Sequence, residues 1–377
     1  MSTGVEVAVI GGGILGAATA DRLAGAGARV TLIEAGEPGR GTSASSFAWL
    51  NSSRKEPRAY HDLNVSGIGA HLALAEQFDA APWLHRDGGL HWATTPQGEA
   101  ELRERAARLR GWGYAMEQIS LAEAREMEPG LLLDPEVVRA IWFTPVEGWC
   151  DVPLLIRHLL DRAREHGATV RSGEAVVGVE RRGDRVAGLR LAGGETVAAD
   201  AVVVCAGPRT AEVTALFGAS LPVTRLAGLL TVTKPVAVPL RRVCLAEKIT
   251  LRADPSGGLL LADAEDLDAT IDSETPLEPL PPACEVALAR GGEFFPEVLR
   301  AGLASARIGV RPLPADDVSI VGALPGLANA YVVATHSGVT LGPLLGRLIA
   351  EEVLTGRPAA QSGAFRAERF GVASRES

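Results

Sequence analysis

A run of glycines after a short apolar stretch near the start of the sequence constrains the fold most. Val5–Ile10 is almost wholly apolar, which is typical of a parallel strand buried on both faces. Gly11-Gly12-Gly13-Ile14-Leu15-Gly16 follows at once and leads into small residues at helical spacing. In such a turn Gly11 permits the tight bend, Gly13 lets a pyrophosphate approach the backbone, and Gly16 lets the helix pack on the strand. The sequence therefore predicts a dinucleotide site at a helix N-terminus.

An acidic residue at the end of the next expected strand indicates which dinucleotide binds there. Arg29–Ile33 has a strand pattern and is followed by Glu34. A carboxylate at this place can accept hydrogen bonds from both ribose hydroxyls of an adenosine, and it would repel the 2′-phosphate of NADP. NAD and FAD remain as alternatives, beside a purely structural glycine turn.

The stretch after Glu34 favours FAD over NAD. Gly39–Ala48 is a run of small and hydroxyl-bearing residues, and no third strand and helix follow Glu34 immediately. Such a run fits a segment that follows a long cofactor along its phosphates and ring, with an ordinary polar loop as the alternative.

Further patterns predict how the chain is organised. Buried-strand patterns at 201–205 and 331–334 and helical patterns at 152–166 and 342–354 resemble the first unit, whereas 89–94, 139–143, 226–233 and a hairpin at 249–262 indicate a different sheet. We expect an α/β fold with a discontinuous Rossmann-like dinucleotide-binding domain and an inserted α+β substrate domain that contains an antiparallel sheet. The predicted boundaries are 1–48, 146–221 and 318–377 for the former and 49–145 and 222–317 for the latter.

Composition excludes several classes of protein. A formal net charge of −9 argues against a nucleic-acid binder, which needs a basic surface. No apolar run is long enough for a membrane-spanning helix, and the N-terminus lacks a signal-peptide pattern, so we expect a cytoplasmic protein. The four cysteines, Cys150, Cys205, Cys244 and Cys284, are widely spaced, which predicts reduced thiols and no metal site.

Four separated blocks, in an order and spacing that span nearly the whole chain, carry a resemblance to a known family. They are Val9–Gly16 with Glu34, Gly39–Ala44, Ala201–Gly207, and Gly309–Pro312 with Ala334–Pro343. In these blocks the chain resembles the D-amino acid oxidase superfamily of FAD enzymes, most of all its glycine oxidase and sarcosine oxidase branch. Because no cysteine or histidine aligns with the covalent flavin link of the sarcosine oxidases, the resemblance implies non-covalent FAD.

The resemblance also implies which residues contact FAD. Residues 42–46 would follow the pyrophosphate and flavin, 47–49 would approach the isoalloxazine, Val176 would meet the adenine, 205–207 would pass the phosphates, and 338–340 would donate N–H groups to the pyrimidine end of the flavin. The full set of predicted cofactor residues is Gly11, Gly13, Ile14, Gly16, Glu34, Ala35, Arg40, Thr42, Ser43, Ser45, Ser46, Phe47, Ala48, Val176, Cys205, Ala206, Gly207, His336, Ser337, Gly338, Val339 and Thr340.

The predicted catalytic residues are Arg311, His336 and Lys248. Arg311 matches the arginine that clamps the substrate carboxylate in glycine oxidase relatives, with a structural ion pair as the alternative. His336 stands where relatives often have a second arginine, and Lys248 falls on the strand that usually supplies an aromatic or histidine contact. The segment Asn51–Lys55 is a further candidate to cover the pocket.

These residues imply an FAD-dependent amine or amino acid oxidase or dehydrogenase. The substrate would be a D-amino acid, a glycine- or sarcosine-like compound or a cyclic amine, whose C–N bond is oxidised by hydride transfer to flavin N5. The expected partners are this substrate and O₂ or another electron acceptor, and the oligomeric state is left open, a homo-oligomer included. The alternatives are a 2-hydroxy acid dehydrogenase, a non-catalytic FAD-binding subunit of a larger oxidase and, as a third choice, an NAD enzyme.

Overall fold

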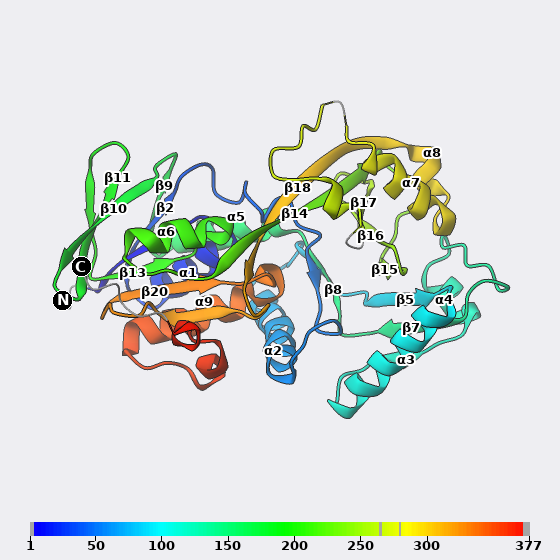
Figure 1. Ribbon diagram of the computed structural model, residues 1–377, viewed down its shortest axis with the longest axis horizontal. Helices are drawn as coiled ribbons and strands as arrows, with labels where there is room; N and C mark the ends of the chain where they lie inside the picture. The colour runs from blue at the N-terminus through cyan, green and yellow to red at the C-terminus, as the bar shows by residue number, and fades with distance from the viewer. Residues whose placement is uncertain (1–3, 264–265, 279, 372–377) are drawn as a thin grey trace.

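Two large β-sheets, which lie side by side, organise the molecule (Figure 1). The computed structural model describes residues 4–263, 266–278 and 280–371, and of Asp263 only the backbone. The first sheet has the strand order β19-β20-β13-β1-β2-β9, and all its strands run parallel except β19. Its strands are β1 (Glu6–Ile10), β2 (Arg29–Glu34), β9 (Thr169–Ser172), β13 (Ala201–Val204), β19 (Ile320–Ala323) and β20 (Ala330–Ala334).

The first sheet is covered on both faces. Val7 and Val9 of β1 lie in a core shared with three helices, while Ala8 and Ile10 lie in a second core on the other face, shared with a small three-stranded sheet. This double cover explains why β1 and β13 are continuous apolar runs. The helices are α1 (Ile14–Gly25), α5 (Val152–Glu165) and α9 (Gly338–Thr355); the small sheet is β10 (Val176–Arg182), β11 (Arg185–Leu191) and β12 (Thr196–Ala198), followed along the chain by η1 (Gly207–Arg209) and α6 (Thr210–Leu216).

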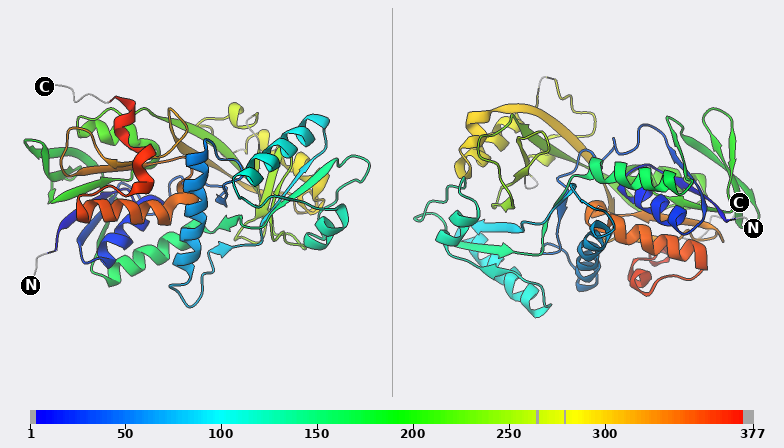
Figure 2. Two further views of the ribbon diagram at one scale, coloured as in Figure 1. Left: turned by 90° about the horizontal axis from the view of Figure 1, so that it is seen from below. Right: turned by 180° about the vertical axis from the view of Figure 1, so that it is seen from behind.

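The second sheet is mainly antiparallel and has the strand order β18-β14-β17-β16-β15-β5-β7-β6. It combines two separated parts of the chain, which meet where β15 pairs in parallel with β5. Its helices pack on both of its faces, in two separate cores. Figure 2 shows this lobe beside that of the first sheet. The sheet confirms the predicted antiparallel unit of the α/β fold. Its strands are β5 (Gly89–Ala93), β6 (Glu117–Gln118), β7 (Ala140–Thr144), β14 (Val223–Thr233), β15 (Val243–Leu245), β16 (Ile249–Ala253), β17 (Leu259–Asp263) and β18 (Leu303–Pro314); its helices are α3 (Pro96–Gly111), α4 (Leu121–Met127), η2 (Asp268–Thr270), α7 (Ala283–Phe294) and α8 (Glu297–Ala301).

Strands β14 and β18 join the two lobes. They pair antiparallel along their whole length, from Val223 opposite Pro314 to Thr233 opposite Leu303. Val223 lies in a core of the first sheet, whereas Leu229 lies in the core of the second. The pair is therefore a continuous connection that fixes the two sheets relative to each other.

The helix α2 (Arg58–Ala75) departs from the predicted organisation. The predicted boundaries place residues 49–145 in the substrate domain, but Tyr60, Leu63 and Ile68 of α2 share the core of α1 and α9. A Cβ on Gly67 would lie 2.6 Å from the Thr340 carbonyl oxygen, so α2 and α9 are in close contact. A division at residue 48 thus separates α2 from the residues on which it packs. The small sheet β3 (Trp49–Leu50), β8 (Gly148–Cys150) and β4 (Leu84–His85) lies beside it.

Helix α9 begins four residues earlier than its sequence pattern predicts and continues through Pro343. A proline inside a helix leaves the carbonyl four residues before it without its N–H donor. Here that carbonyl belongs to Val339, and it lies 2.8 Å from Nε2 of the buried His71. Burial lowers the pKa of His71 to about 4, so the ring is neutral and donates from Nε2. His71 therefore replaces the missing donor. The chain ends in the short helices η3 (Ala360–Phe365) and η4 (Ala367–Phe370), and no described helix meets the length and apolarity of a bilayer-spanning one.

Candidate active site

The glycine turn lies where β1 and β13 end and α1 begins. Gly11 has a φ of +107°, and a Cβ on it would lie 2.4 Å from the Cys205 carbonyl oxygen. A Cβ on Gly16 would lie 1.8 Å from the carbonyl oxygen of Gly11, so both positions exclude a side chain. Gly13, the N-cap residue of α1, has no side chain to cap the helix. The first N–H groups of α1 consequently face the turn, as an anion site requires.

Glu34 lies directly beside this turn. Its carboxylate accepts hydrogen bonds from the backbone N–H groups of Gly12 (2.7 Å) and Gly36 (2.8 Å). The Glu34 carbonyl accepts from the N–H of Glu174 (3.0 Å), which brings Val176, two residues later, to the same edge of the sheet, next to the exposed Ala35. This geometry fits an adenosine whose ribose is held by Glu34.

The segment of small residues crosses from the glycine turn to β18. Ser43 Oγ accepts the N–H of Ile14 (3.1 Å), and the Thr42 hydroxyl donates to the Val310 carbonyl. A Cβ on Gly309 would lie 1.9 Å from the Ser45 carbonyl oxygen, so β18 touches this segment directly. Ala48 ends the turn with a φ of +58°, and its N–H donates to Ser46 Oγ (3.0 Å).

Arg252, which sequence reasoning missed, holds the end of that segment. Its Nε donates to the Phe47 carbonyl (2.5 Å), and its guanidinium lies over the Trp149 ring at 4.4 Å. Burial lowers the pKa of Arg252 to about 10, so it keeps its charge at neutral pH. The sequence does contain a sign of this role, because Arg252 is the charged residue of the otherwise largely apolar strand β16. The predicted cofactor residue Arg40, by contrast, is exposed, and its side chain forms no hydrogen bond or ion pair with the described part of the chain.

A second helix N-terminus reaches the same place. A Cβ on Gly338 would lie 3.8 Å from Ile14, and one on Gly342 would lie 2.7 Å from it, so α9 starts beside the start of α1. Ser337, the N-cap residue of α9, makes no side-chain cap, which leaves the N–H groups of residues 338–340 at the helix start available. Thr340 Oγ1 donates to the Trp49 carbonyl (3.2 Å). The residues predicted around the pyrophosphate and flavin are thus brought together, with Cys205, Ala206 and Gly207 at the end of β13. Two helix starts whose own N-cap residues make no side-chain cap, together with an acidic residue, fit FAD.

Arg311 and His336 lie in one electrostatic neighbourhood with Lys55. Burial lowers the pKa of His336 to about 3, and Lys55 and Arg311 contribute to the same shift. Burial likewise lowers the pKa of Lys55 to about 8, against the attraction of Glu147. At neutral pH a neutral imidazole therefore lies near two cations. Of the predicted segment 51–55, Lys55 is thus placed with the predicted substrate residues.

Arg311 already has one acidic partner. Its Nη2 lies 2.7 Å from Asp268 Oδ2 and 3.0 Å from the Ala227 carbonyl oxygen. Its Nε is buried and has no acceptor among the described residues. A Cβ on the neighbouring Gly228 would lie 2.8 Å from the guanidinium, so glycine there gives Arg311 its room. Arg311 therefore forms the ion pair that was the alternative to a substrate contact, and its Nε–H is still available to a ligand.

The buried Glu147 anchors segment 51–55, and no sequence pattern indicated this role. Its Oε1 accepts the N–H groups of Ser52 (3.0 Å) and Ser53 (2.9 Å) and the Tyr114 hydroxyl (2.8 Å), and Oε2 lies 3.2 Å from Thr144 Oγ1. Two of the donor segments are distant in the sequence, and the donor of the third, Thr144, lies three residues before Glu147. A carboxylate bonded in this way fixes the backbone that carries Lys55.

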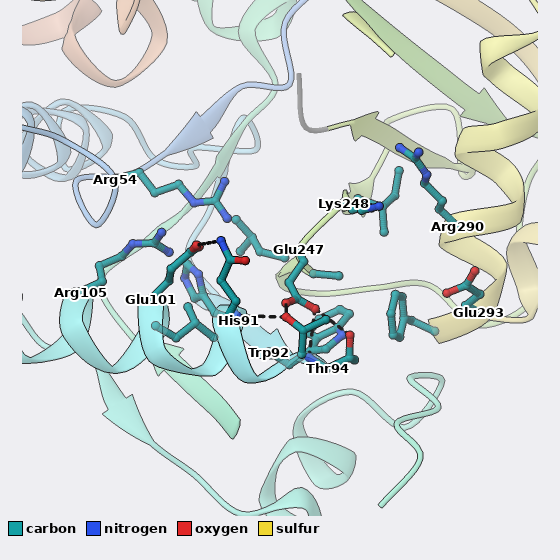
Figure 3. A pocket seen from close by; sticks show the side chains of 18 of the residues that line it. Arg54, His91, Trp92, Thr94, Glu101, Arg105, Glu247, Lys248, Arg290 and Glu293 are labelled. Carbon is teal, nitrogen blue, oxygen red and sulfur yellow. Dashed lines mark hydrogen bonds between the residues drawn. The ribbon is translucent and has the colours of Figure 1, made fainter. Parts of the chain in front are cut away.

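A cavity of about 850 Å³ opens beside this segment (Figure 3). Arg54 and the α3 residue Arg105 lie on one side of the cavity. Lys248 and the α7 residue Glu293 lie on the other side. The prediction that Lys248 lies on a strand is wrong, because Lys248 is exposed in the turn between β15 and β16. No described contact joins Lys248 to Arg311 or His336, so its placement with them in one catalytic group is not seen.

Comparisons with known proteins agree with this geometry. The model of the family described as FAD dependent oxidoreductase, DAO, matches residues 6–352. A glycine oxidase of Geobacillus kaustophilus is 28% identical over 356 residues, covering 92% of each chain. A protein of Agrobacterium tumefaciens that is named as one of the subunits of an opine oxidase is 26% identical over 376 residues, covering 97% of this chain and 98% of the relative. The crystal structure of the Geobacillus kaustophilus glycine oxidase superposes with a TM-score of 0.84 at 25% identity, over 97% of this chain and 99% of that one. The family match covers most of the sequence, which confirms the predicted resemblance and FAD as the cofactor: the chain belongs to the DAO family of FAD-dependent oxidoreductases.

Proposed function

We propose that this protein oxidises the C–N bond of a small amine or amino acid whose carboxylate is held by Arg311 beside Lys55. The observation that carries the proposal is the buried Arg311 Nε, which has no acceptor among the described residues while Nη2 is fixed by Asp268. A buried donor without a partner costs free energy, and a carboxylate would satisfy it. Bound FAD supplies the acceptor for the hydride that leaves the carbon next to nitrogen.

The charges around the site favour an amine over a 2-hydroxy acid. Lys55 and Arg311 would lower the pKa of a substrate ammonium, and the amine must lose that proton before its C–H bond can be oxidised. A hydroxyl substrate needs a base instead. His336, with a pKa of about 3, is a weak base at neutral pH.

The relatives support the same substrate class and also suggest a second candidate. Glycine oxidases act on an amino acid by their name. The Agrobacterium tumefaciens relative is named as part of an opine oxidase with more than one kind of chain, which favours a protein that works inside a larger assembly. In that case the isolated chain would bind FAD and would be reduced only after its partner is added.

Anaerobic mixing of the purified protein with candidate substrates tests the proposal. We expect at least one D-amino acid, N-methyl amino acid or cyclic amine to bleach the flavin absorbance. Bleaching by 2-hydroxy acids alone would contradict the amine assignment. A protein that no compound reduces until a second kind of chain is supplied would establish the other candidate.

The pH dependence of carboxylate binding tests the role of Lys55. The lowered pKa of about 8 means that Lys55 is a cation below this pH and becomes neutral above it. We therefore expect the dissociation constant of an amine-free aliphatic carboxylate, followed by the flavin spectrum, to rise as pH increases through about 8. His336 stays neutral down to about pH 3, so it should add no inflection between pH 5 and 7. Lys55→Met should remove the inflection near pH 8; an unchanged profile in this variant would exclude Lys55.

A further inference from the structure

The geometry points to a second anion subsite, formed by Arg54 and Arg105 at the cavity, which selects amine substrates that carry a second carboxylate. This inference rests on the proposed function and specifies the substrate class further. The two guanidinium groups come from separate elements, segment 51–55 and α3, and both face the same cavity (Figure 3).

Neither arginine has the acidic partner that most arginines here possess. In residues 4–371, apart from the few positions left undescribed, no ion pair joins Arg54 or Arg105 to a carboxylate. The adjacent Arg108 shows the contrast, because it lies 2.6 Å from Glu56. Two neighbouring guanidinium groups repel each other unless an anion lies between them.

Like charge adds to the effect of burial at both groups. Burial lowers the pKa of Arg54 to about 10, with repulsion by Arg105 as the next cause; burial also lowers the pKa of Arg105, with repulsion by Arg108 as the next cause. Both stay cationic at neutral pH. Arg54 is also accessible to solvent, and its guanidinium lies 5.6 Å from the centre of the Trp49 ring. The pair is thus charged, held in place and open to a ligand.

The acids near the pair do not balance it. The charges around Arg54 are the carboxylates of Glu147 and Glu101 and the cations of Arg105 and Lys55. Glu147 is already bonded to backbone and hydroxyl donors, and Glu101 accepts the Gln97 amide (2.9 Å). With Arg108 and its partner Glu56 beside Arg105, four cations face three carboxylates, which leaves one positive charge in excess within a chain of net charge −9.

Neighbouring residues connect the arginine pair to Arg311, the proposed site of the first carboxylate. Arg54 directly precedes Lys55, which acts on His336, and His336 in turn lies near Arg311. In the proposed binding mode one substrate places a first carboxylate on Arg311 and a second on the arginine pair, with its nitrogen between them. The two carboxylates would meet charge-assisted donors at both ends.

The test compares N-substituted glycines that end in a carboxylate with those that end in the isosteric amide, over arms of one to three methylene groups. For the best arm length we expect kcat/KM of the acid to exceed that of the amide by about 10- to 100-fold, the worth of charge-assisted hydrogen bonds to one carboxylate. Arg105→Gln should reduce this ratio at least about tenfold. The ratio should also fall with added salt, because the pair is accessible to solvent.

The matched control is Arg103→Gln on the same helix, since Arg103 is exposed and paired with Glu99 (2.8 Å). It should leave the acid-to-amide ratio as in the wild type. Binding of glutarate and butyrate, followed by calorimetry, gives a readout without turnover: glutarate should bind more tightly, and Arg105→Gln should remove the difference. Equal ratios for acids and amides at every arm length, or an equal loss in both arginine variants, would overturn the subsite. If no amine in either series bleaches the flavin while 2-hydroxy acids do, the proposed function fails instead.

Discussion

Arg311→Gln is expected to lower kcat/KM for a carboxylate-bearing amine by about 100-fold or more, while the purified variant stays yellow. Arg311 offers a buried Nε and a guanidinium held by Asp268, so its loss removes the charge that positions the substrate carboxylate. Both KM and kcat should suffer, because a substrate that is bound without this contact no longer presents its C–H bond in one orientation. Stopped-flow reduction of the flavin measures both effects.

Arg225→Gln is the matched control for this prediction. Arg225 lies on the neighbouring strand β14 opposite Pro312, and its side chain is half exposed at 3.8 Å from Glu212. We expect its kcat/KM to stay within about twofold of the wild type, since an exposed pair of this length is worth little. If Arg311→Gln behaves like Arg225→Gln, Arg311 is only the partner of Asp268.

Gly13→Val should weaken FAD binding by about 10- to 100-fold, as overpacking by an isopropyl group implies. The backbone at Gly13 is extended, with a φ of −75° and a ψ of −175°, so valine is tolerated there without strain. A Cβ would lie 3.2 Å from Ser43 Oγ, at the start of α1 where the pyrophosphate is expected. Flavin absorbance per protein and calorimetric titration with FAD measure the loss, and thermal unfolding of the FAD-free proteins shows whether the fold is kept.

Gly25→Ala at the other end of α1 is the control, because a Cβ on Gly25 meets only the His166 ring, at 3.9 Å. It should bind FAD as the wild type does. Retention of FAD by Gly13→Val at wild-type affinity would mean that the cofactor does not approach the backbone at this turn.

Local patterns in the sequence predict the fold class and the dinucleotide site. β1 and β13 are apolar because both faces of their sheet are covered, and this burial is a property of each strand alone. The glycine turn is likewise local, since Gly11 and Gly16 exclude side chains that would meet atoms a few residues away or on the adjacent strand. Such features leave a mark in the sequence that needs no knowledge of distant partners.

Contacts between distant segments left no such mark. The pairing of Arg311 with Asp268, 43 residues earlier, and of Glu147 with the N–H groups of Ser52 and Ser53 depends on how segments far apart in the sequence pack together. The continuation of α9 through Pro343 depends on His71 of another helix. Each of these residues has an ordinary sequence context, so only the assembled fold shows its role.

The close packing of α1 on α9 also sets a length. Gly342 and Gly346 of α9 lie against Ile14 and Ala18, so the two helix starts cannot slide relative to each other. Glu34 accepts the N–H of Gly12 just before α1, and residues 338–340 form the start of α9. The packing of the two helices thus fixes the separation between the expected adenosine and flavin ends of the cofactor.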